Sequence, residues 1–163
     1  MNQDRHPILA ESQELRERFQ TALMATVNAE AEPEASYTPY LFHDDKFYIF
    51  VSGLSAHTAN LRDNGRVSLL FIEEESQARN LFARKRLTYQ CSARPIARDD
   101  ERWPALLDLY QDRFGPTVEM LRQLPDFILF ELEPRRGNFV KGFGQAYLLE
   151  GDSLREVRQA TGK

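Results

Sequence analysis

Three adjacent cations, Arg84, Lys85 and Arg86, lie in the segment "LFARKRLT" (81–88) of a chain whose formal net charge is −4. The stretch that follows, "LTYQCSARPI", has the composition of a buried strand. Because side chains alternate along a strand, Arg84 and Arg86 are expected on one face and Lys85 on the other. Two guanidinium groups on one face can hold a carboxylate or a phosphate. The alternative is that both arginines pair with the acidic run at 73–75.

A second stretch with chemical potential is "SGLSAHTANL", which joins a predicted strand to a predicted helix. Ser55 is suited to cap this helix, whose first backbone N–H groups would then attract an anion. His57 follows in the first turn. The alternative is a capped surface helix with a solvated histidine. The other histidines, His6 and His43, fall in a terminal arm and a polar turn.

The remaining polar residues give no metal or nucleophile motif. The histidines are far apart, and Cys91 is the single cysteine, so neither a metal-ligand cluster nor an internal disulfide is indicated. The sequence "GFG" (142–144) favours a bulge or a close backbone approach over a phosphate loop. Asp126, just before the apolar "FILF", is interpreted from its position alone as a turn residue.

Length and composition predict one soluble domain over 1–163, since 42% of the 163 residues are hydrophobic and 28% are charged. The acidic balance disfavours a nucleic-acid partner, which usually requires a basic domain. The longest aliphatic run is far shorter than the roughly 20 residues of a membrane span. With neither a membrane span nor a signal-peptide core, the chain is expected in the cytoplasm.

Hydrophobic periodicity predicts about six strands with helices at the ends and connections. Early strands follow one another as hairpins, which favours an antiparallel β-barrel with packed helices over a βαβ fold. The expected helices are 7–20, 53–65, 99–115 and 116–124. The expected strands are 21–29, 35–42, 46–52, 66–74 and 86–98, then 126–135 and 137–151 as a hairpin, followed by a polar tail, 152–163.

Four motifs in this order, "SGLSAHTANL", "NLFARKRLT", "FILFELEP" and "FVKGFGQAYLLEGDSL", resemble the haem-utilization proteins of the HutZ/HugZ type. These belong to the FMN-binding split-barrel superfamily of pyridoxamine 5′-phosphate oxidase. The resemblance covers about residues 20 to 154. It implies a mainly β fold with flanking helices, a six-stranded antiparallel split β-barrel that forms a homodimer, with ligand sites between the subunits.

Two departures from the family pattern bear on the ligand. Flavin oxidases carry a Ser-Arg-Lys run that grips the flavin phosphate, and here Ser55 is followed by Ala56 and His57. The resemblance therefore favours haem over FMN. Haem-type relatives also place a ligating histidine in a C-terminal tail, but the tail here has none. Asp126 matches the acidic residue that contacts and orients that histidine in some relatives. It is therefore a candidate for a residue that acts on the iron ligand without contacting the haem itself.

The resemblance thus implies a haem-binding homodimer that stores or degrades haem. Arg84, Lys85 and Arg86 would hold the carboxylates, with Ser55 and His57 beside them. His57 would be the iron ligand. The rival hypotheses are an FMN-dependent oxidoreductase of the pyridoxamine 5′-phosphate oxidase type and a non-enzymatic carrier or regulator without a cofactor. The residues alone assign no catalytic base and do not decide whether the protein is an enzyme.

Overall fold

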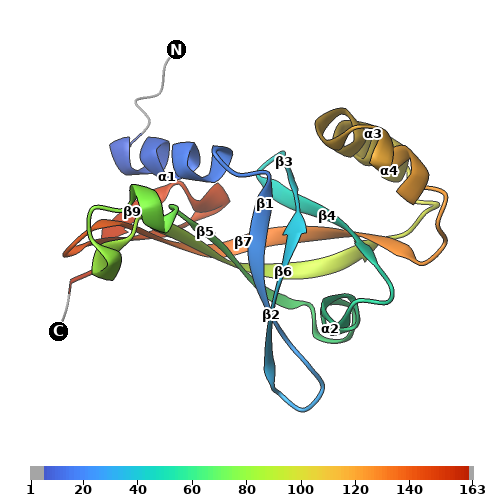
Figure 1. Cartoon of the computed structure of the whole chain (residues 1–163), viewed down its shortest axis with the longest axis horizontal. Coiled ribbons are helices and arrows are strands. Elements are labelled where there is room, and N and C mark those ends of the chain that lie inside the picture. The colour runs from blue at the N-terminus through green and yellow to red at the C-terminus, as the bar shows by residue number, and fades with distance from the viewer. Residues whose placement is uncertain (1–5, 162–163) are drawn as a thin grey trace.

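The computed structural model describes residues 6–161, so the outermost ends of the predicted domain 1–163 and of its tail 152–163 lie outside it. All nine strands in this range belong to one antiparallel sheet (Figure 1). They are β1 (Thr21–Val27), β2 (Pro33–Pro39), β3 (Leu41–His43), β4 (Lys46–Ser52), β5 (Arg66–Ile72), β6 (Arg86–Ile96), β7 (Phe127–Gly142), β8 (Gln145–Glu150) and β9 (Glu156–Gln159).

The helices lie at the margins of the sheet. They are α1 (Pro7–Glu17), α2 (Ala56–Asn64), α3 (Trp103–Phe114) and α4 (Pro116–Leu121), with short 3₁₀ turns η1 (Glu75–Gln77), η2 (Leu81–Ala83) and η3 (Asp152–Leu154). Figure 1 shows α3 and α4 together at the end of the molecule near β4, while α1 lies at the other end, on the side of β9. The predicted end of α2 is confirmed, because Gly65 takes the left-handed conformation that closes a helix (φ 67°).

The predicted antiparallel sheet with flanking helices is confirmed, whereas the six-stranded barrel is not, because the described residues form nine strands in a sheet that is not closed. The nine strands run in the order β2-β1-β5-β6-β7-β4-β3, with β8 and β9 beyond β7, and within residues 6–161 no ladder joins β2 to β3. The first part of β7 pairs with β4 and its last part pairs with β8. The sheet therefore divides along β7 into two parts.

The predicted hairpin between 126–135 and 137–151 is also wrong. Gly137 continues β7 instead of turning, because its missing side chain leaves space for Leu149: a Cβ there would lie 3.0 Å from the Leu149 Cβ. The chain turns at the "GFG" segment, where Gly144 has a φ of 68°. Its partner strand β8 ends at Glu150, and β9 occupies part of the tail that was expected to be irregular or helical.

Alternation along the strands gives the sheet a core face and an outer face. Across β1, β5 and β6, the fully buried residues Met24, Leu69 and Tyr89 are cross-strand neighbours. A second set of cross-strand neighbours lies on the opposite side of the sheet, and none of its members is buried. We call this set the outer face. It consists of Leu23, Tyr37, Leu70, Ile72, Arg86, Thr88, Asn138, Val140, Ala146 and Leu148. Most of the outer face is apolar.

Candidate functional site

The turn that leads into α2 is joined to the start of β7. The backbone N–H of Gly53 donates to the carbonyl oxygen of Asp126 at 2.7 Å. A Cβ at Gly53 would lie 2.8 Å from that same oxygen, so glycine permits this approach. The hydroxyl of Ser52 also donates to the Asp126 carboxylate at 3.3 Å. Asp126, interpreted from its position as a turn residue, thus lies beside the beginning of α2.

His57 lies half-buried between α2 and β2. Its Nδ1 atom is 3.0 Å from the hydroxyl oxygen of Ser36. Burial lowers the pKa of His57, which favours the neutral imidazole. A neutral imidazole whose Nδ1 is engaged can present Nε2 to a metal. Ser55 has the extended backbone of an N-cap residue, but its side chain makes no capping hydrogen bond, so its hydroxyl is available to a ligand.

Two buried polar residues hold α2 in place. Thr58 donates from its hydroxyl to the carbonyl oxygen of Ser52 at 2.5 Å. Asn60 donates to the hydroxyl of Thr26 at 3.0 Å and to the carboxylate of Glu34 at 2.9 Å. These contacts tie the first turns of α2 to β1, β2 and the end of β4, so the position of His57 is fixed by the sheet.

The basic triplet does not lie on a strand as expected, because β6 begins only at Arg86. Arg84 precedes it and donates from Nε to the backbone carbonyl of Glu73 at 3.1 Å, with a further hydrogen bond from Nη2 to the same oxygen. Its Nη1 atom also lies 3.8 Å from the Glu75 carboxylate. Arg84 therefore pairs with the acidic run at 73–75, as the alternative prediction had it.

Arg86 and Lys85 are placed differently from Arg84. Arg86 is opposite Ile72 on β5 and Val140 on β7, which puts it on the outer face among apolar neighbours. Its side chain donates to the Arg84 carbonyl at 3.3 Å. Lys85 uses its backbone N–H to bind the Glu73 carboxylate at 2.8 Å. Its side chain lines a hollow that neither arginine lines.

Within one chain, the contact of His57 and the register of Arg86 place these two members of the predicted site on opposite faces of the sheet. β5 begins just after α2 and ends opposite Arg86, and its seven residues cover about 20 Å at about 3.3 Å per residue. His57 also contacts Ser36, whose register partner, Met24, faces the core. Arg86 faces the other way.

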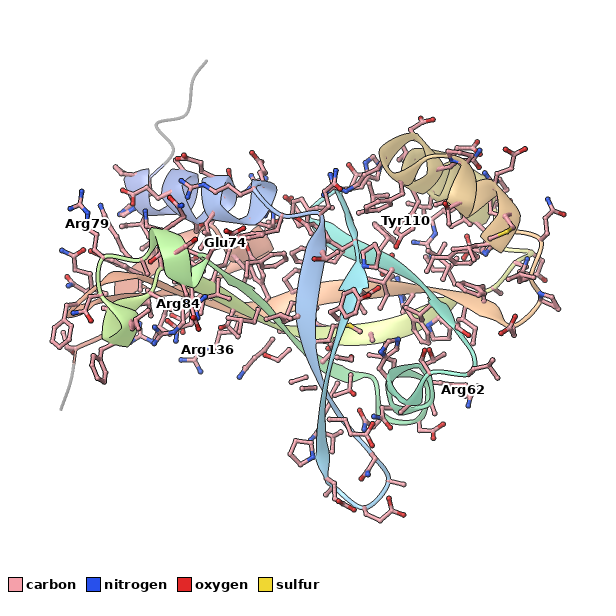
Figure 2. All side chains as sticks on the ribbon, in the orientation of Figure 1. Arg62, Glu74, Arg79, Arg84, Tyr110 and Arg136 are labelled. Carbon is pink, nitrogen blue, oxygen red and sulfur yellow. The ribbon has the colours of Figure 1, made fainter. Side chains whose placement is uncertain are left out.

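Sequence reasoning missed Arg136. It is the register partner of Gln90, two residues along from Thr88 of the outer face, and it is exposed. Its Nη2 atom lies 3.8 Å from the Glu150 carboxylate. Arg136 belongs to β7 and lies opposite Gln90, four residues along β6 from Arg86 (Figure 2). No sequence signal marks it, because only the pairing of β6 with β7 relates it to Arg86.

The described residues hold neither a metal-ligand cluster nor a reactive thiol. Residues 6–161 contain no group of three or more metal-ligating side chains. Burial raises the pKa of Cys91 to about 12, which keeps the thiol protonated and unreactive. None of the helices in this range is long and apolar enough to cross a membrane. What the arrangement offers is cations on an apolar face and a neutral histidine at a helix start.

Residues 8–141 match the pyridoxamine 5′-phosphate oxidase family, and the chain belongs to that family. Over 144 residues it is 42% identical to the heme oxygenase HutZ of Vibrio cholerae, a match that covers 88% of this chain and 82% of that protein. The resemblance to haem-utilization proteins that the motifs indicated is thereby confirmed.

Solved structures agree with this relationship. The crystal structure of HutZ, described as the heme storage protein from Vibrio cholerae, has a TM-score of 0.74 and 37% identity, covering 80% of this chain and 92% of that one. Campylobacter jejuni ChuZ has a TM-score of 0.78 and 34% identity, covering 88% of this chain and 59% of that one. The antiparallel sheet with flanking helices is thus shared with both.

Proposed function

We propose that this protein binds haem and serves in its storage or degradation. The observation that carries the proposal is the position of Arg86, a cation held in an apolar row of the outer face, between Ile72 and Val140. Haem is a flat apolar ring with two carboxylates, and such a surface suits both parts. The relative HutZ, which is described as a heme oxygenase and as a heme storage protein, supports the same ligand.

The residues of the chain fit haem as follows. Arg86 would hold a propionate, with Arg136 on the same side of β7. His57, kept neutral by burial, would offer Nε2 to the iron, with Asp126 beside the turn that begins its helix. Bound haem supplies iron chemistry with oxygen. The protein's part is to bind it, orient it and exclude water around it.

We infer further that the protein is a homodimer formed through the outer face. Tyr37 is 65% exposed and its register partner Leu23 is 48% exposed, in an apolar row that continues through Leu70 of β5. Contiguous exposed apolar surface of this kind marks an interaction site. A ligand at the subunit boundary could then contact Arg86 of one subunit and the α2 region of the other, which one chain by itself does not allow.

An FMN-dependent oxidoreductase is the second candidate. The observation in its favour is the uncapped hydroxyl of Ser55 at the start of α2, which could accept a phosphate together with the backbone N–H groups. Ala56 and His57 weaken it, because they replace two cations of the flavin enzymes. A carrier or regulator without cofactor is the third. In all three the chain would work as a single split-barrel domain in the cytoplasm, with no membrane or nucleic-acid partner.

The test is a titration of the purified protein with hemin and, separately, with FMN. We expect a Soret band that saturates with added hemin. Quenching of flavin fluorescence without a saturable Soret band would replace haem by the flavin hypothesis. No response to either ligand would leave the carrier hypothesis.

A further inference from the structure

A hollow of about 490 Å³ lies beside the basic triplet, and Lys85 lines it whereas Arg86 does not. It is formed between the 73–85 segment and the end of β7 with its turn, and its lining includes Glu73, Arg79, Lys85, Lys141 and Phe143. Its volume is in the range of pockets that bind small molecules. Lys85, which the sequence grouped with the two arginines, belongs to this hollow through its side chain.

The hollow carries cations that the chain does not neutralise. Arg79 and Lys85 make no side-chain hydrogen bond or ion pair within residues 6–161, whereas Lys141 contacts the Glu11 carboxylate at 2.7 Å. Glu73 is the acidic residue of the lining, and one of its carboxylate oxygens already accepts the Lys85 N–H. Figure 2 shows Arg79 extending outward from its segment, whereas Arg84 lies over the strands. An anionic group would therefore meet positive charge here.

Aromatic surface accompanies these cations. Phe143, in the turn after β7, lines the hollow and is 77% exposed. Phe82, on η2, is 92% exposed, and η2 packs against β7. Two phenyl rings left in water at the tips of short loops are unusual in a fold that buries its other phenylalanines more fully. A flat ligand could cover this surface while its charged groups reach Lys85 and Arg79.

We propose that this hollow is a second binding site, for an aromatic ligand that carries carboxylate or phosphate groups. Phe143 contacts the flat part of the ligand, and Lys85 and Arg79 hold the anionic groups. Arg86 does not line this hollow, so the site uses other cations than the haem site proposed above. Two ligands share the required chemistry: the porphyrin of haem, through its propionates, and FMN, through its phosphate.

The experiment compares the wild type with the double variant Arg79→Gln, Lys85→Gln. Iron-free protoporphyrin and FMN are titrated separately and followed by their own fluorescence, and the arm that binds identifies the ligand. We expect at least tenfold weaker binding of that ligand in the variant, because two charge-assisted contacts are lost. The matched control, Arg18→Gln with Arg62→Gln, removes two exposed arginines elsewhere and should bind as the wild type does.

A second readout locates the ligand directly. Saturating ligand should protect Lys85 from acetylation, measured by mass spectrometry, and should leave Lys46 of β4 as reactive as before. The proposal is overturned if neither probe binds the wild type, if the double variant binds both probes unchanged, or if Lys85 is not protected. The Arg86→Ala variant tests hemin binding at the haem site of the proposed function. Comparing it with the double variant therefore distinguishes loss of the haem site from loss of the hollow.

Discussion

The Nδ1 atom of His57 lies 3.0 Å from the hydroxyl oxygen of Ser36, which ties the first turn of α2 to the core-facing side of β2. This contact orients the ring and leaves Nε2 as the atom that a ligand can reach. It also places His57 on the other side of the sheet from Arg86. On the dimer proposed above, we expect a ligand that uses both residues to contact them from two subunits.

We expect His57→Ala to change the absorbance spectrum of the hemin complex, because this neutral imidazole is the candidate iron ligand. Free imidazole added to the variant should restore part of the spectrum. His43→Ala serves as the control, since His43 is the last residue of β3 and its Nε2 atom lies 3.2 Å from the Asp44 carboxylate. Identical spectra for all three proteins would show that His57 does not contact the iron.

We expect Arg84 to contribute to stability and Arg86 to contribute to ligand binding. Arg86→Ala is expected to weaken hemin binding about tenfold, the effect of losing one charged hydrogen bond of about 1.5 kcal/mol, with little change in stability. Arg84→Ala should lower the free energy of unfolding by about 1.5 kcal/mol, because it frees the Glu73 carbonyl and the 73–85 segment. Hemin titration and urea unfolding of both variants measure the split. Equal effects on both quantities would contradict it.

The outer face should be the subunit interface. Light scattering at micromolar concentration is expected to give the mass of a dimer for the wild type and of a monomer for Leu23→Asp. A charge in the centre of an apolar interface must be desolvated on association, whereas in the monomer it stays in water. Met120→Asp is the matched control, because Met120 is 60% exposed on α4, away from the outer face. A Leu23→Asp variant that remains dimeric would move the interface elsewhere.

Glu131 is the most enclosed charge of the described residues, at 1% exposure, and it joins three strands to α3. Its carboxylate accepts from Arg94 at 2.8 Å, from Arg102 at 2.9 Å and from Lys46 at 3.4 Å. Tyr48 donates to it as well, at 3.3 Å. Arg102 is the residue just before α3, so this cluster fixes where α3 begins on the sheet.

Glu131→Gln should lower the free energy of unfolding by about 2–3 kcal/mol, because it leaves three cations around a buried neutral amide. Urea unfolding at neutral pH measures the loss. Glu14→Gln removes an exposed ion pair with Arg18 and should cost less than about 0.5 kcal/mol. A Glu131 variant as stable as this control would show that the cations are satisfied by solvent.

The same cluster predicts an acid-sensitive part of the stability. Burial acts to raise the pKa of Glu131, but the hydrogen bond from Arg94 and the charge of Lys46 hold it below its ordinary value of 4.5. As the pH falls below about 4.5, Glu131 in the unfolded chain takes up a proton before Glu131 in the folded protein does. The stabilisation by this carboxylate is therefore complete above about pH 4.5 and is lost as the pH falls through the pKa of the folded state. Between pH 6 and pH 3, the free energy of unfolding should decrease less steeply for Glu131→Gln than for the wild type, as measured by unfolding curves at each pH.

Local sequence patterns were sufficient for the elements and the family. Gly65 ended its helix as predicted because only the left-handed conformation closes α2 there, and that preference is local. The four motifs likewise carried the relationship to the haem-utilization proteins. The region around position 136 shows where such reasoning failed: a hairpin turn was predicted between 135 and 137, but β7 continues through Gly137, whose missing side chain leaves space for Leu149 of β8.

The positions of the candidate site residues depended on the tertiary structure more than the secondary-structure elements and the family did. The sequence by itself determined that cations cluster at 84–86 and that a histidine follows a helix start, because these are facts of adjacency. Only the register of β5, β6 and β7 decided that Arg84 binds the Glu73 carbonyl, that Arg86 joins an apolar outer face and that Lys85 lines a separate hollow. Neighbouring side chains diverge on leaving the backbone, and what each one meets is set by strands far away in the sequence.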